Sequence, residues 1–133
     1  MTEAATQSIE ALVRAYFAGT DYSGGSDPTM YAVKTDGFLK EAGFPLKKAV
    51  QIINAYTKSS GFYIPGSHLR SATESTIAKL VDRNLSAEDA IRLISTFSQL
   101  SDYAESVPSL SNSVLAALDY MAAKGYSAEE IVQ

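Results

Sequence analysis

The sequence predicts an all-α protein of about six helices arranged in antiparallel hairpins. Apolar residues recur at i, i+3 and i+4 along nearly all of the 133 residues, which is the spacing of amphipathic helices. In addition, one short pattern occurs three times at intervals of 41 residues, at 43–45, 84–86 and 125–127. Two helices and their loops fill such an interval, so the chain is either a short helical-repeat array or an irregular helical bundle.

The repeated pattern predicts tight corners between helices. Each copy begins with a residue that tolerates the left-handed conformation, namely Gly43, Asn84 or Gly125. A large apolar residue follows, and then Pro or Ser, which favour a helix start. The alternative is that helical hairpins of ordinary length produce the same spacing by chance.

The first two expected helices differ in how firmly the pattern defines them. The first has its apolar stripe between Ile9 and Phe17 and ends at Gly19. The second covers 28–43 and begins at Asp27-Pro28, a cap followed by a proline in the first turn. It contains Asp36-Gly37, a turn signal, so a strand at 30–34 followed by a turn is the competing prediction. The internal period favours the helix.

Four more stripes predict helices around 46–56, 69–81, 90–104 and 110–122. The residues Ser86 to Asp89 form a capping signal before the third of these stripes. Ser127-Ala-Glu-Glu130 is a similar signal, but only about two helical turns remain before Gln133. We therefore expect a single helical domain over 1–133. The alternative that this ending leaves open is a fragment or the N-terminal domain of a longer chain.

Composition excludes several kinds of chemistry. There is no cysteine and one histidine, His68, so a disulfide scaffold, a thiolate metal site and a zinc site with two imidazoles are excluded. The formal net charge of −4 makes nucleic acid an unlikely partner. No apolar run is long enough for a membrane span, and the N-terminus does not resemble a signal peptide. We expect a cytoplasmic protein, of a cell or of an infected host.

No motif in the sequence indicates catalysis, a metal or a cofactor. His68 follows Ser67 near an expected helix start, and neighbouring residues there seldom form a catalytic pair. The acidic pairs Glu88-Asp89 and Glu129-Glu130 fall in first helical turns, where negative charge is stabilising. The loop 19–27 lacks the ligands of a phosphate or calcium loop.

Two groups of residues are candidate binding sites. Phe62, Tyr63 and Ile64 are large and apolar in a loop bounded by glycines, which suggests contact with a partner, and Tyr22 is a further candidate. Alternatively, the loop residues plug the end of a hairpin. Residues 28–58 carry a net charge of +3. The lysines in this segment are a candidate patch for an anionic ligand, and the alternative is that they lie on solvated helix faces. The patch consists of Lys34, Lys40, Lys47, Lys48 and Lys58.

The favoured function is a non-enzymatic helical module for protein–protein interaction, or a component of an assembly. Its expected partner is a protein or a second copy of the chain, and no cofactor is expected. The alternative is a helical bundle that binds a small ligand or catalyses a reaction in a pocket between helices, using Tyr, Ser and His68. A nucleic-acid role through the lysines is a third reading.

Overall fold

The computed structural model describes residues 3–19, 28–59, 66–100 and 106–126. Within these ranges the chain forms six α-helices and no strand, so the all-α prediction is confirmed. The helices are α1 (Glu3–Gly19), α2 (Pro28–Ala42), α3 (Leu46–Ser59), α4 (Gly66–Arg83), α5 (Ala87–Leu100) and α6 (Val107–Lys124).

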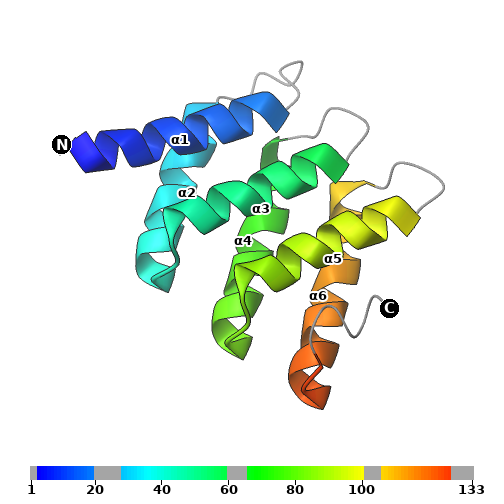
Figure 1. Ribbon diagram of the computed structural model, residues 1–133. Helices are drawn as coiled ribbons and strands as arrows, with labels where there is room; N and C mark the ends of the chain where they lie inside the picture. The colour runs from blue at the N-terminus through cyan, green and yellow to red at the C-terminus, as the bar shows by residue number, and fades with distance from the viewer. Residues whose placement is uncertain (1–2, 20–27, 60–65, 101–105, 127–133) are drawn as a thin grey trace.

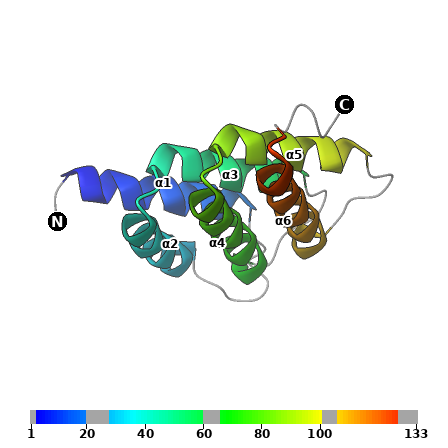
Figure 2. The same ribbon diagram turned by 90° about the horizontal axis from the view of Figure 1, so that it is seen from below.

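The helices form two layers. Helices α1, α3 and α5 lie side by side in one layer, and α2, α4 and α6 lie side by side in the other (Figures 1 and 2). The helices of the first layer run across Figure 1, whereas those of the second run down it. Because sequential helices belong to different layers and cross each other, their predicted antiparallel arrangement is not confirmed.

Helix boundaries recur along the chain at a constant offset. Helices α3 and α5 begin at Leu46 and Ala87, and α4 and α6 begin at Gly66 and Val107, an offset of 41 residues in both cases. Helices α2 and α4 end at the same offset. Residues 41 apart in these helices therefore occupy corresponding positions in successive helix pairs. A true helical-repeat array stays a prediction, with an irregular helical bundle as its alternative.

The corners at Gly43 and Asn84 are confirmed, and so is the left-handed residue of the third, Gly125, after which the expected helix lies outside the described residues. Their first residues all have positive φ: 71° at Gly43, 56° at Asn84 and 73° at Gly125. In each corner the next amide donates to a carbonyl of the helix that has just ended, which satisfies that carbonyl. The bonds run from Phe44 to Leu39 (3.1 Å), from Leu85 to Leu80 (2.9 Å) and from Tyr126 to Met121 (3.1 Å).

Segment 28–42 is a helix, as the internal period predicted, and the competing strand is wrong. Asp36 does not begin a turn; its carboxylate pairs with Lys40 at 2.9 Å on the same helix. Gly37 lies inside α2 and faces open space. A glycine at such a position costs about 1 kcal/mol relative to alanine, so packing of α2 against α1 and α4 must compensate.

The core lies between the two layers and is continuous from α1 to α6. Its largest fully buried side chains are tyrosines, Tyr16 on α1 and Tyr56 on α3. Buried hydroxyl groups lie among the apolar residues, at Thr35, Thr73 and Thr76 among others. Because a buried hydroxyl is costly without a partner, the tyrosines and threonines constrain how successive helix pairs pack.

Candidate functional site

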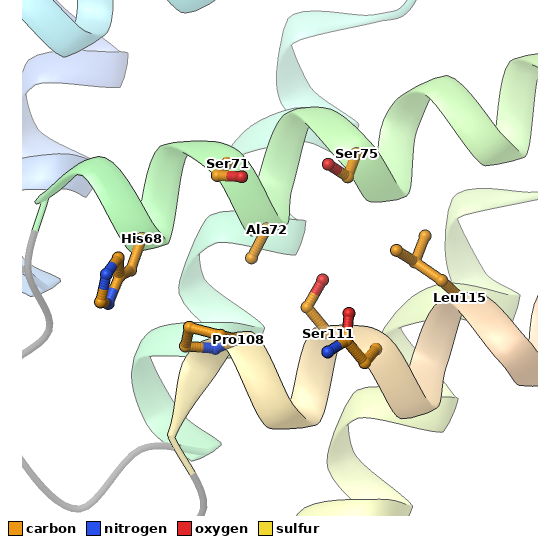
Figure 3. A pocket seen from close by; sticks show the side chains of 8 residues that line it. His68, Ser71, Ala72, Ser75, Pro108, Ser111 and Leu115 are labelled. Carbon is orange, nitrogen blue, oxygen red and sulfur yellow. The ribbon is translucent and has the colours of Figure 1, made fainter.

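A groove of about 310 Å³ lies between α4 and α6. Figure 3 shows Ala72 on α4 facing Ser111 and Leu115 on α6, with His68 at the N-terminal end of α4. The residues that line it are His68, Ser71, Ala72, Ser75, Pro108, Ser111, Asn112 and Leu115. We call this lining the α4–α6 groove.

The groove lies where small side chains occupy positions that are large in the preceding pair of helices. In the contact between α2 and α4, which we call the first joint, the positions hold Tyr31, Arg70 and Glu74. In the contact between α4 and α6, the second joint, the corresponding residues are Ala72, Ser111 and Leu115. The second joint therefore carries less side-chain volume at two positions, Ala72 and Ser111, and at the third it exchanges a carboxylate for the apolar Leu115. All three residues line the groove.

The first joint is held by an extended hydrogen-bond network. Thr35 donates to the Glu74 carboxylate at 2.9 Å, and Arg70 Nε donates to the same oxygen at 2.8 Å. Because the Thr35 proton is used in this way, the Tyr16 hydroxyl, 2.7 Å from Thr35 Oγ1, must be the donor to Thr35. The network links α1, α2 and α4 and leaves none of these hydroxyls unpaired.

The two joints also differ at the position that packs against Tyr31 in the first joint. Gly66, at the start of α4, is buried, and a Cβ atom there would overlap the ring of Tyr31. The residues that correspond to Gly66 and Tyr31 are Val107 and Ala72, both buried. One joint thus combines a ring with a glycine, and the other combines a methyl group with a valine.

The bottom of the α4–α6 groove connects to a buried hydroxyl pair. The Tyr56 and Thr76 hydroxyl oxygens lie 2.7 Å apart, and Ser111 also hydrogen-bonds Tyr56. Burial raises the pKa of Tyr56 above its ordinary value, although the hydrogen bonds with Thr76 and Ser111 act in the opposite direction. Tyr56 is therefore a neutral hydroxyl at physiological pH and orients the side chain of Ser111.

An ion-pair cluster closes the second joint beyond Leu115. Lys79 Nζ lies 2.9 Å from Asp119 Oδ1, and Arg83 Nε lies 3.3 Å from the same oxygen. The hydrogen bond from Lys79 is the largest cause of a lowered pKa of Asp119. This carboxylate is therefore ionised and engaged by cations, outside the groove lining.

The groove presents neutral hydrogen-bonding groups. Ser71, Ser75, Asn112 and His68 are exposed along it. No carboxylate is part of the lining. The described parts of the chain also contain no cluster of three or more side chains suited to a metal ion. The arrangement can donate and accept hydrogen bonds over an apolar floor formed by Ala72 and Leu115.

A second, smaller groove of about 240 Å³ lies between α3 and α5 in the other layer. Asn54, Lys58 and Ser95 supply its polar groups, and Ile91 supplies an apolar wall. Lys58, one of the predicted patch lysines, thus lines a groove.

The structure does not bring the predicted lysine patch to one place. Lys40 pairs with Asp36, and Lys48 forms an ion pair with Glu88 of α5, which lowers the pKa of Glu88 through a hydrogen bond. Lys47 and Lys58 lie near opposite ends of α3, about 16 Å apart along the axis at 1.5 Å per residue. Lys34 is exposed on α2.

The other predicted contact residues fall outside the described ranges. These are Phe62, Tyr63, Ile64 and Tyr22, together with the short helix expected after Ser127. Of the groove residues, the sequence drew attention to His68 alone. Serine and alanine carry little signal by themselves, but comparing positions 41 residues apart would have revealed the loss of volume at the second joint.

Comparisons with protein-family models, with curated proteins and with solved structures gave no match. Within the described ranges, no helix has both the length and the apolar character needed to cross a bilayer.

Proposed function

We propose that this chain is a non-enzymatic helical interaction module that binds an extended peptide segment of a protein partner in the α4–α6 groove. One observation carries the proposal. At corresponding positions, the large Tyr31 and Arg70 occupy the first joint, whereas the small Ala72 and Ser111 leave a groove in the second, with the apolar Leu115 in place of Glu74. Close packing is the usual state of a joint between helices, so a recess of this size is a good candidate for a binding surface.

The lining suits a peptide backbone. Ser71, Ser75 and Asn112 offer hydroxyl and amide groups that both donate and accept, as backbone N–H and C=O groups require. Leu115 and Ala72 provide an apolar surface for one or two side chains. Nucleic acid is a poorer fit, because its phosphates call for lysine or arginine and neither lines this groove.

A binding role is favoured over catalysis by the groups that are present. A general acid–base mechanism needs a positioned pair of titratable groups, and His68 is the one titratable side chain of the lining. The nearby carboxylate of Asp119 is held by Lys79 and Arg83. We also propose that the chain acts in the cytoplasm. Further predicted contacts with the partner are Phe62, Tyr63, Ile64 and Tyr22.

The test is selection from a random peptide library displayed on phage, with the purified chain as bait. Peptides selected by the wild type should lose at least tenfold in affinity for Ser75→Trp, because the indole would fill the groove. The matched control is Ala78→Trp, which adds the same side chain at an exposed position of α4 outside the lining. Equal losses for both variants, or none for either, would contradict the proposal.

The same selection separates the peptide site from the alternative of a small-ligand pocket. A peptide site gives recovered sequences with a common pattern, and binding survives changes in the smaller α3–α5 groove such as Ser95→Trp. Failure to recover any peptide, combined with stabilisation of the chain by a small polar metabolite, would favour the small-ligand alternative.

A further inference from the structure

Large apolar side chains are exposed at both ends of the second layer. Met30 and Val33 on α2 are 49% and 51% exposed. Tyr120 on α6 is 50% exposed and forms a ring pair with Tyr126, with centroids 5.8 Å apart. Helices α2 and α6 are the first and last of their layer in Figure 1, and α4 lies between them. Each therefore has a free side in the described part of the chain.

The free side of α6 matches the side of α4 that packs on α6. Ser109, Ser113, Ala116 and Tyr120 form one exposed stripe with the spacing of a helical face. Their corresponding residues on α4 are His68, Ala72, Ser75 and Lys79. The first three line the α4–α6 groove, and the fourth pairs with Asp119 of α6. The free side of α6 therefore has the register of a joint.

The free side of α2 matches the opposite half of such a joint. Met30, Val33 and Gly37 are exposed on one face of α2. The residues of α6 that correspond to them, two intervals along the chain, contact or face α4; they are Asn112, Leu115 and Asp119. The two free sides are thus the two complementary halves of the packing that already joins α4 to α6.

We infer that the α6 side of one chain packs against the α2 side of a second copy, which continues the two-layer array from head to tail. The Lys79–Asp119 ion pair between α4 and α6 defines the register of the contact between copies. Tyr120 corresponds to Lys79, and Gly37 corresponds to Asp119. Tyr120 of one copy would then lie over Gly37 of the next. No atom lies within 4 Å of the Cβ position at Gly37, so the ring has room there.

The rest of the register is complementary in size and charge. In this register, small Ala116 of one copy faces Val33 of the next, and small Ser113 faces Met30. Ala116 and Ser113 correspond to Ser75 and Ala72, which face α6 in the second joint. At the end of the contact, Lys124 corresponds to Arg83, which contacts Asp119. On the opposing copy, the exposed Glu41 lies one turn beyond Gly37 and can pair with Lys124.

This contact is heterologous, since two different sides of the chain meet. Such a contact leaves one free side at each end of a dimer, so association continues to longer series unless the rotation closes a ring. The inference uses the free sides of α2 and α6 and is independent of the proposed peptide site, which lies within a single chain.

The first test is sedimentation velocity of the chain over a wide range of concentration. The average mass should rise with concentration beyond that of a dimer. Gly37→Leu should abolish the rise, because the side chain fills the space for Tyr120, while the helix itself becomes more stable because leucine is a better helix former than glycine. The control is Val81→Ser, which removes an exposed apolar side chain from α4. Because α4 is the middle helix of its layer, this change should leave association unchanged.

The second test mixes two variants that each keep one intact side. Gly37→Leu and Tyr120→Lys should both be monomeric alone, and together they should form a dimer that grows no further. A wild type that stays monomeric at every concentration would overturn the inference and indicate that residues 127–133 or another protein cover α6. A closed dimer that persists in Gly37→Leu would overturn it in favour of contact between two α6 helices.

Discussion

The first and second joints perform the same structural task with different chemistry. In the first joint, Arg70 and Glu74 of α4 complete a hydrogen-bond network with Thr35 and Tyr16. Beside the second joint, Tyr56 and Thr76 form a similar hydroxyl pair, in which Thr76 corresponds to Thr35 but Tyr56 does not correspond to Tyr16, and Ser111 of α6 is the further partner. The first joint is filled by long polar side chains, and the second keeps a groove.

The comparison shows that a packing defect in a helical array can be a local change of a few side chains. The helices on either side of the second joint are as regular as those of the first, and buried residues of both helices belong to the common core. We therefore expect the two joints to differ in their roles. The hydrogen-bond network of the first joint contributes to stability, and the second joint is proposed to bind a partner.

The largest expected effect comes from breaking the network of the first joint. Thr35→Val keeps the shape of the side chain but leaves the fully buried hydroxyl of Tyr16 without its acceptor and removes a bond to Glu74. We expect the free energy of unfolding to fall by about 2–4 kcal/mol in urea titrations.

Two controls place that result in context. Thr76→Val in the second joint should cost less, about 1–2 kcal/mol, because Tyr56 retains Ser111 as a partner. Thr57→Val removes a hydroxyl that bonds only the Ile53 carbonyl of its own helix, and a change within about 0.5 kcal/mol is expected. Equal costs at Thr35 and Thr57 would remove the basis for a special first joint.

The next effect concerns Gly37 and Gly66, which lie within α2 and α4. Gly66→Ala should destabilise the chain by about 1–3 kcal/mol, because the added methyl group overlaps the ring of Tyr31. Tyr31→Leu in the same chain should recover part of that loss. Gly37→Ala should instead stabilise it by about 0.5–1 kcal/mol, because that position faces open space. Thermal melts of the variants at one low concentration check the opposite signs.

Raising the pH should destabilise the first and second joints through their tyrosines. Burial is the largest cause of the raised pKa of Tyr16 and of Tyr56. In the unfolded chain these two side chains ionise near the ordinary tyrosine pKa of about 10, whereas burial keeps them protonated in the folded chain. Their contribution to stability is therefore complete below that pH and is lost progressively as the pH rises above it. Urea midpoints measured from pH 8 upward should fall; Tyr16→Phe should flatten the dependence, and exposed Tyr120→Phe should not.

The smallest effect is expected at low pH in the second joint. The hydrogen bond from Lys79 is the main cause of the lowered pKa of Asp119. Its contribution is present above the ordinary aspartate pKa and is lost as the pH falls through the lowered value. Because the pair is partly exposed, the loss is small and screened by salt. Asp119→Asn should weaken the acid dependence of the melting temperature, and a stronger dependence would contradict this assignment.

Much of the fold could be predicted from the sequence because it is local. The corners at Gly43, Asn84 and Gly125 are visible as residue types, since few residues accept a positive φ. The α-helical period also outweighed the misleading turn signal of Asp36-Gly37, because α2 is held by its contacts with α1 and α4. The all-α class follows from these features.

The groove could not be predicted in the same way because it depends on the difference between two distant contacts. Serine and alanine are common on helix surfaces, so Ser71, Ala72 and Ser75 carry no signal by themselves. The hydroxyl pairs Tyr16–Thr35 and Tyr56–Thr76 join residues 19 and 20 apart on different helices, and they become evident only when both helices are placed. The lysines, in contrast, formed a pattern in the sequence that the structure distributes over α2 and both ends of α3.

The most direct test of the account is a double-mutant cycle at Ala72 and Val107. The central claim is that these residues correspond to Tyr31 and Gly66, with the sizes reversed. Ala72→Tyr alone should destabilise the chain through overlap with Val107, and Val107→Gly alone should do so by loss of a buried side chain. Together they rebuild the ring-and-glycine pair of the first joint, so the double variant should be at least about 1 kcal/mol more stable than the sum of the single changes predicts. Strict additivity in urea unfolding would contradict the correspondence of the two joints.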